Sequence, residues 1–240
     1  MNKKILTPII MGIMLLGMLF WAVPPSIFAP NPARNPETTA STISTPSTSE
    51  ELPSTDAYKK ITHPTMENTI LMVIAFKDFR DEEYLQPKKV FEQAGFSVAT
   101  TSTKTGRAEG SYGTTVIVDT DINQINPDDY EAVVFCGGGG MGQELDNPVF
   151  QKLAQDFSKA DKPVTAICIA PALLAKAGLL QDKEATVWAS PLDRSAVKIL
   201  EANGAIYKEE SVVRDGSTIT ANGPAAAEEF GEAIVQLLNN

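Results

Sequence analysis

The sequence is almost free of histidine. Its 240 residues include one, His63, which lies in a stretch rich in Pro, Ser and Thr and not in the globular part. Cysteine–histidine dyads, serine–histidine–aspartate triads and histidine-based metal sites all need an imidazole. The globular part therefore cannot form any of these sites. A homo-oligomer cannot supply them either, because the globular part of every copy lacks histidine. We expect no metal and no other cofactor.

Positive charge and cysteine are also scarce. The chain has 20 Lys and Arg against 30 Asp and Glu, a formal net charge of −10, and no basic cluster. Nucleic acids and acidic lipids bind positively charged surfaces, so neither is an expected partner of the globular part. Two cysteines, Cys136 and Cys168, are too few for a disulfide scaffold. They lie on neighbouring predicted strands, and in an exported protein the two could still pair.

The chain begins with a long apolar run. Lys3 and Lys4 precede the 19-residue span 5–23, which is long enough to cross a hydrocarbon core of ~30 Å. The apolar region of a cleaved signal peptide is usually shorter, ~7–15 residues. We predict a signal anchor over residues 1–23, with a cleaved signal peptide as the alternative. The globular domain is then extracytoplasmic at the cell membrane, or secreted if the segment is cleaved.

Residues 24–67 are rich in Pro, Ser and Thr and poor in apolar side chains. Such a composition does not bury enough apolar surface to offset the entropy lost on ordering. We predict a disordered tether there and a globular domain over residues 68–240.

The globular part alternates apolar runs with helical patterns. Predicted strands cover 70–76, 97–101, 132–136, 163–168, 185–188, 212–214 and 217–221, and 114–119 is expected to form an edge or antiparallel strand. Predicted helices pass through 88–94, 148–158, 191–203 and 224–238. This order predicts an α/β fold with a mostly parallel sheet and helices on both faces.

Cys168 is the most informative residue. The β-branched run 164–167 ends at this cysteine, and Pro171 then has the backbone angle that suits the first position of a helix, with Gly178 as its expected C-cap. A thiol at this turn lies near unpaired N–H groups, which favour the thiolate and can lower the thiol pKa. The same amides can hold a developing oxyanion. The alternative is a buried cysteine that acts as a small hydrophobic residue.

Two other motifs follow predicted strands. The run 137–142 (Gly-Gly-Gly-Gly-Met-Gly) formally matches a dinucleotide-binding pattern, but we expect no helix to open directly from it, because Pro148 begins the next one. Its bare N–H groups are better suited to face Cys168 as the second half of an oxyanion pocket; a flexible turn is the alternative. Asp81, Glu82 and Glu83 start a helix, and a carboxyl directed at the cysteine would have a raised pKa.

Four motifs together resemble the ThiJ/PfpI family of the DJ-1/PfpI superfamily. They are Phe79-x-Asp81-x-Glu83, the segment 129–138, Ala166-Ile-Cys168-x-x-Pro171 and the segment 215–224, and they span about 69–238. The resemblance implies a flavodoxin-like, class I glutamine amidotransferase-like fold with Cys168 on a nucleophile elbow. It also implies that Glu83 hydrogen-bonds to the thiol and that Gly138 and the Ile169 amide line the oxyanion site. Possible pocket residues are Gly139, Tyr84, Trp188 and Ser190, and Phe79 is a further residue that could line the pocket.

The sequence departs from the protease branch of that family. Ile169 follows the cysteine where intracellular proteases have histidine, and Ser190-Pro191 stands where other members have a later His-Pro. Ser190 can offer a hydroxyl, although a serine before proline is more often a helix cap. Proteolysis is therefore not expected. The leading hypothesis is a glyoxalase- or hydrolase-like enzyme for small carbonyl compounds; a redox sensor of the stress-response type and a chaperone-like domain are the alternatives, and relatives suggest a homodimer.

Overall fold

The computed structural model describes residues 68–240, so the predicted anchor (1–23) and tether (24–67) lie outside the described residues. Among the residues that are described, no helix is long and apolar enough to cross a membrane. The anchor, the tether and the location that follows from them stay predictions.

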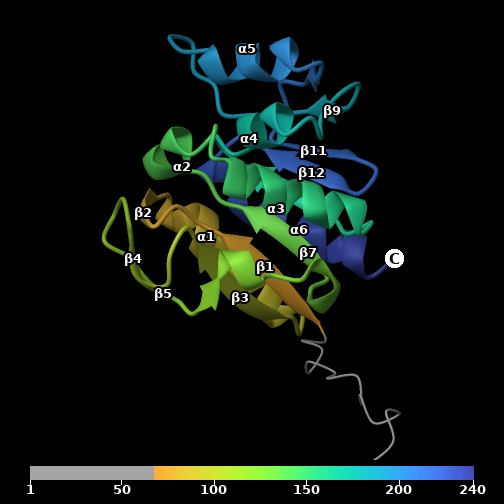
Figure 1. Ribbon diagram of the computed structural model, residues 1–240. Coiled ribbons are helices and arrows are strands. Elements are labelled where there is room, and N and C mark those ends of the chain that lie inside the picture. Colours follow the sequence, from red (N-terminus) through yellow and green to blue (C-terminus); the bar gives the residue numbers. More distant parts are fainter. Residues whose placement is uncertain (1–67) are drawn as a thin grey trace, which may run out of the picture. The chain divides into compact units, whose positions relative to one another are not determined.

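A seven-stranded sheet forms the centre of the domain (Figure 1). Its strands lie in the order β11-β12-β8-β7-β1-β3-β6, and every neighbouring pair is parallel except β11 and β12. Their bounds are β1 Thr69–Val73, β3 Ser97–Ser102, β6 Thr120–Asp121, β7 Ala132–Phe135, β8 Val164–Ile167, β11 Val212–Asp215 and β12 Thr218–Ala221. This arrangement confirms the α/β class and the mostly parallel sheet.

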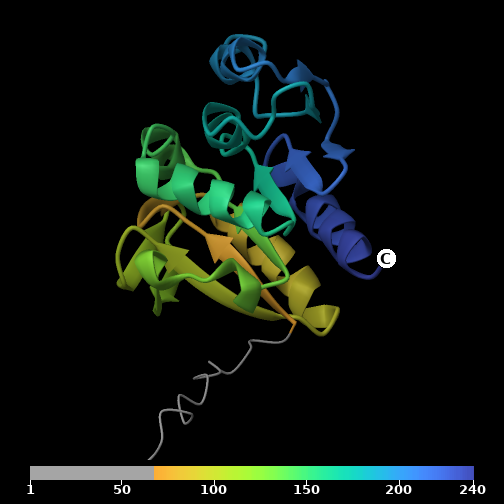
Figure 2. The ribbon, with the colours of Figure 1, turned by 45° about the vertical axis from the view of Figure 1, so that its right-hand side comes forward.

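Helices cover both faces of this sheet (Figures 1 and 2), which is why β1, β7 and β8 are buried throughout. Alternate residues of β1 point to opposite faces: Leu71 belongs to the same buried apolar cluster as Phe150 of α3, and Met72 belongs to the cluster that contains Phe91 of α1 and Phe230 of α6. The helices are α1 Asp81–Gln93, α3 Pro148–Lys159, α4 Pro171–Lys176, α5 Ser195–Ala202 and α6 Ala227–Leu238. The two resulting apolar cores hold the carboxyl ends of β1, β7 and β8 in fixed positions.

Two predictions about where helices begin were wrong. A short helix, α2 Gly139–Gln143, does open directly from the glycine run. Helix α5 begins at Ser195 and not at Pro191, because residues 190–193 form a turn in which the Ser190 N–H donates to the Asp193 carbonyl at 2.9 Å. The hydroxyl of Ser190 accepts from the Asp193 N–H at 3.0 Å, so it stabilises this turn.

A small second sheet stands beside the main one. It consists of β2 Lys77–Phe79, β4 Gly106–Gly110 and β5 Thr115–Val118, in the order β2-β4-β5. The segment expected to be an edge or antiparallel strand is β5, which pairs antiparallel with β4. A further pair, β9 Glu184–Ala185 and β10 Ile206–Tyr207, is parallel. Three 3₁₀ turns complete the described chain at Ile122–Gln124, Pro127–Asp129 and Pro224–Ala226.

Candidate active site

Cys168 lies at the sharp bend between β8 and α4. Its φ of 65° is in the left-handed region, which is costly for a residue with a side chain and is found at functional sites. Two backbone bonds hold the bend: the Cys168 N–H donates to the Ala221 carbonyl, and the Trp188 N–H donates to the Cys168 carbonyl, both at 2.8 Å. Pro171 occupies the first turn of α4, as predicted. The elbow geometry that the family resemblance implied is present.

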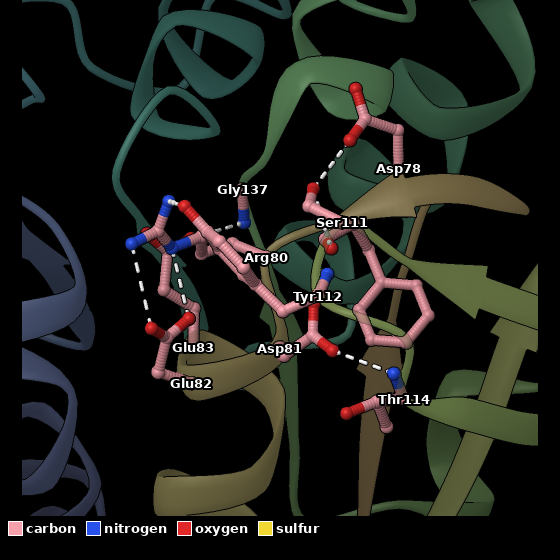
Figure 3. Close-up of polar contacts among 10 residues, drawn as sticks. Asp78, Arg80, Asp81, Glu82, Glu83, Ser111, Tyr112, Thr114 and Gly137 are labelled. Carbon is pink, nitrogen blue, oxygen red and sulfur yellow. Dashed lines mark hydrogen bonds and ion pairs between the residues drawn. The ribbon is translucent and has the colours of Figure 1, made fainter.

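Glu83 reaches the cysteine from the first turn of α1. The Arg80 N–H just before this helix donates to the Gly137 carbonyl at 3.1 Å, which ties the start of α1 to the loop after β7. The Glu83 side chain is fully buried, and its Oε2 accepts a hydrogen bond from the Gly137 N–H at 3.0 Å (Figure 3). Oε1 is buried too and has no N–H or O–H partner among the described residues. The Cys168 thiol lies close enough to the carboxyl to lower the pKa of Glu83.

Gly137 separates the two reactive groups by its backbone alone. A β-carbon at this position would stand 2.6 Å from Cβ of Cys168 and 2.6 Å from Oε2 of Glu83, distances at which atoms overlap. Gly138 and Gly139 were predicted as site residues from the sequence, but Gly137 was not. The glycine run was the signal for it, but only the tertiary structure shows which glycine lies between sulfur and carboxyl.

The carboxyl and the thiol shift each other's ionisation. Burial raises the pKa of Glu83 to about 7, against the opposing effects of its hydrogen bonds with Cys168 and Gly137. Burial also raises the pKa of the Cys168 thiol well above its ordinary value, and the negative charge of Glu83 raises it further. The N–H groups of Gly138 and Ile169 act in the opposite direction by hydrogen-bonding to the sulfur.

The expectation that the amides alone would lower the pKa of Cys168 was therefore wrong. They do face the sulfur, but burial and the ionised carboxyl outweigh them. Protonation of Glu83 removes the second of these effects, because its negative charge is then gone and its O–H can donate to sulfur, which stabilises the thiolate.

The cysteine opens into a cavity of about 430 Å³. Its lining includes Gly138, Gly139, Ile169 and Trp188 among the predicted residues and adds Arg80, Ser111, Gly142 and Pro224. Tyr84 and Phe79 are core residues that pack edge to face, and the Tyr84 hydroxyl hydrogen-bonds to Thr100 Oγ1 at 2.8 Å. Ser190 lines a neighbouring cavity with Trp188. Of the possible pocket residues, Gly139 and Trp188 border the cysteine's cavity, whereas Tyr84 and Ser190 do not.

The turn between β4 and β5 contributes Ser111 to the lining of this cavity, and Figure 3 shows its polar contacts with the residues around the start of α1. Buried Asp81 accepts hydrogen bonds from the N–H groups of Tyr112 at 2.9 Å and Thr114 at 2.8 Å, and Asp78 accepts one from the Ser111 hydroxyl. Burial raises the pKa of Asp81, but these hydrogen bonds outweigh it and lower the pKa overall. Two of the three acidic residues that start α1, Asp81 and Glu83, are thus buried, and Asp81 holds the hairpin turn in place.

Arg80 brings a positive charge to the cavity. Its Nη1 donates to the Tyr112 hydroxyl at 2.7 Å, its Nε lies 2.9 Å from Oε2 of Glu82, and its guanidinium lies 4.5 Å from the centre of the Tyr112 ring. Arg80 was not among the predicted site residues, because nothing in the order of residues shows that the hairpin turn folds back over the start of α1.

Cys136 and Cys168 are both free, so the pairing left open above does not occur in the structure. The register of β7 and β8 explains this. Phe135 lies opposite Ala166, so the next residues place Cys136 opposite Ile167, and Gly137, not Cys136, faces Cys168. The Cys136 thiol is buried and directed at the Glu83 carbonyl at 3.5 Å. Among residues 68–240, no group of three or more His, Cys, Asp or Glu is placed to hold a metal ion.

Comparison with known proteins gives a consistent result. The model of the DJ-1/PfpI family matches residues 68–237. An uncharacterized protein of Methanocaldococcus jannaschii is 42% identical over 170 residues, which cover 70% of this chain and 82% of the relative. A Bacillus subtilis protein provisionally named a cysteine protease is 32% identical, with 70% and 97% covered. A protein of Pyrococcus abyssi named a deglycase is 27% identical, with 70% and 98% covered.

Solved structures show the same relationship. The crystal structure of a ThiJ/PfpI domain protein from Brachyspira murdochii superposes with a TM-score of 0.68 at 32% identity. The match covers 72% of this chain and 96% of that one. The whole of the related domain therefore has a counterpart in this chain.

Proposed function

The chain belongs to the DJ-1/PfpI family, and on that premise we propose that it is an enzyme that acts on small carbonyl compounds through covalent addition to Cys168. The observation that carries the proposal is the pairing of two groups: the half-buried Cys168 thiol, which lines a cavity, and the buried Glu83 carboxyl, whose Oε1 has no N–H or O–H partner among the described residues. A nucleophile and a proton carrier that exchange one proton are the minimum set for carbonyl addition.

Transfer of a proton between Cys168 and Glu83 generates the nucleophilic sulfur. Because the pKa of Glu83 is about 7, its carboxylate is well populated at neutral pH, and it takes the proton of the Cys168 thiol as the sulfur attacks. Once protonated, the carboxyl O–H donates to sulfur, and the amides of Gly138 and Ile169 stabilise the thiolate. The sulfur then attacks the carbonyl carbon, a C–S bond forms and the C=O electron pair moves to oxygen. Glu83 returns its proton to that oxygen, which leaves a hemithioacetal.

For a 2-oxoaldehyde the same carboxylate can complete the reaction. Glu83 takes the proton from the former aldehyde carbon and delivers it to the neighbouring carbon, while the hydroxyl proton of the hemithioacetal passes to the neighbouring carbonyl oxygen; together these transfers give the thioester of a 2-hydroxy acid. Water then hydrolyses the thioester and releases the thiol. Residues 68–240 contain no histidine, so Glu83 takes the part of the proton carrier in this scheme.

The chemistry of the site favours this over peptide-bond cleavage. A leaving amine needs a separate general acid, and Ile169 stands next to the nucleophile where the protease branch has histidine. The names of the deglycase and protease relatives describe those proteins, and neither decides the substrate of this chain.

Turnover of methylglyoxal by the full chain, compared with Cys168→Ser and Glu83→Gln, tests the proposal. Both changes are expected to abolish turnover, whereas Glu92→Gln, an exposed carboxyl on the same helix, should leave it unchanged. If the wild-type protein turns over no aldehyde in a panel while peroxide oxidises Cys168 selectively, the redox-sensor alternative is favoured instead. Membrane anchoring and a homodimer remain predictions that this assay does not address.

A further inference from the structure

A second cavity lies directly beside the one that holds Cys168. Its volume is about 550 Å³, against about 430 Å³ for the first, and the two share Trp188 and Pro224 as lining residues. A three-carbon carbonyl compound does not require both spaces. A longer molecule whose reactive end is at Cys168 would pass Trp188 and enter the second cavity.

The second cavity presents one positive and one negative side chain that do not neutralise each other. Arg194, just before α5, and Glu209, just after β10, both line it, and neither takes part in an ion pair among the described residues. The Arg194 guanidinium lies 5.3 Å from the centre of the Tyr207 ring, which restricts its orientation.

Two charged side chains next to these in the sequence, Lys208 and Asp193, already have partners within the protein. Lys208 lies 2.7 Å from a carboxylate oxygen of Glu184, outside this lining, and Asp193 accepts a hydrogen bond from the Ser195 N–H at the start of α5. Arg194 and Glu209 are therefore the two charged groups left to meet a ligand in this cavity.

We propose that the second cavity binds an amino-acid-like end, in which Arg194 holds a carboxylate and Glu209 holds an ammonium group. A guanidinium and a carboxylate match these two groups in charge and hydrogen-bonding pattern. A purely anionic ligand would place its charge near Glu209 without pairing it, and a purely cationic ligand would do the same near Arg194. The side chains of Trp188 and Pro224 supply apolar contact along the path between the cavities.

The inference rests on the proposed function only for the other end of the ligand, the carbonyl at Cys168. Binding of the zwitterionic end is a separate property that needs no reaction. Arg194 and Glu209 are exposed, so water competes for both groups, and we expect weak affinity.

Fluorescence titration of the full chain tests the binding. Trp188 is the single tryptophan of residues 68–240, and Trp21→Phe removes the other one in the sequence. L-leucine is expected to change the Trp188 signal saturably, in wild type and in Cys168→Ser alike. Its two one-charge analogues, 4-methylpentanoate and 3-methylbutylamine, should each bind about tenfold more weakly, because each lacks one charge-assisted contact.

Matched variants identify the residues. Arg194→Gln and Glu209→Gln should each weaken leucine binding about tenfold. Lys198→Gln and Glu201→Gln, exposed on α5 and outside the cavity lining, should not. Leucine binding no tighter than that of either analogue, or unaffected by both cavity variants, overturns the inference. Leucine binding without any aldehyde turnover leaves it standing and refutes the proposed function; turnover without leucine binding does the reverse.

Discussion

Gly137 lies between Cys168 and Glu83 with no room for a side chain. Its N–H donates to Oε2 of Glu83 at 3.0 Å, and a β-carbon on it would stand 2.6 Å from Cβ of Cys168. The closeness of sulfur and carboxyl therefore depends on a residue that contributes only backbone.

Gly137→Ala should separate the reactive pair. The new methyl group overlaps both neighbours, and overpacking of this kind costs about 1–3 kcal/mol of folding stability. We expect a lower midpoint in chemical denaturation and loss of the pH dependence that Glu83 imposes on Cys168 alkylation. Gly142→Ala is the matched control, since its β-carbon would meet only Ile169 Cγ1 at an ordinary 3.9 Å. Equal behaviour of the two variants would contradict the steric argument.

Glu83→Gln should change how stability depends on pH. The native pKa of Glu83 is raised from 4.5 to about 7, so the folded protein holds a proton that the unfolded chain has released. The stabilising effect of this proton is present below pH 4.5 and is lost as the pH rises through 7. Wild type should lose roughly 3 kcal/mol of unfolding free energy over that range relative to Glu83→Gln. Urea denaturation of both proteins at several pH values measures the difference, and parallel curves would show that the carboxyl is not shifted.

Only one of the two thiols should react in the folded protein. Cys168 lines the cavity, whereas Cys136 is fully buried in the core. Intact-mass analysis after iodoacetamide treatment should show one adduct on the native chain, none on Cys168→Ser, and two on the wild type after denaturation. A mass change on reduction before alkylation would instead reveal a disulfide between them.

Asp81→Asn should loosen the hairpin turn. Asp81 accepts the N–H groups of Tyr112 and Thr114 in a buried position, and the loss of such charge-assisted bonds costs about 1–3 kcal/mol. Because the native pKa of Asp81 is lowered, its contribution is present above the unfolded pKa and disappears as the pH falls through the native pKa. Hydrogen exchange should show faster exchange at residues 112 and 114, and Asp119→Asn, exposed after β5, should not produce it.

Much of this molecule was determined by the order of its residues. The apolar runs of β1, β7 and β8 predict buried parallel strands, because only strands covered on both faces are apolar throughout. Pro171 after a strand that ends at Cys168 indicates the sharp turn, because proline suits the first turn of a helix. These are local patterns, and local backbone preferences are enough to read them.

The rest was decided by contacts between distant segments. Three features depend on how distant elements pack against one another. They are the glycine that lies between sulfur and carboxyl, the contact of Arg80 with Tyr112, and the placement of Tyr84 in the core and Trp188 at the cavity. The ionisation of Cys168 is the clearest case. Its sequence neighbours supply the amides that favour a thiolate, but burial and the charge of Glu83, which is 85 positions away in the chain, outweigh them. Desolvation and charge proximity are properties of three-dimensional packing, and no local pattern encodes them.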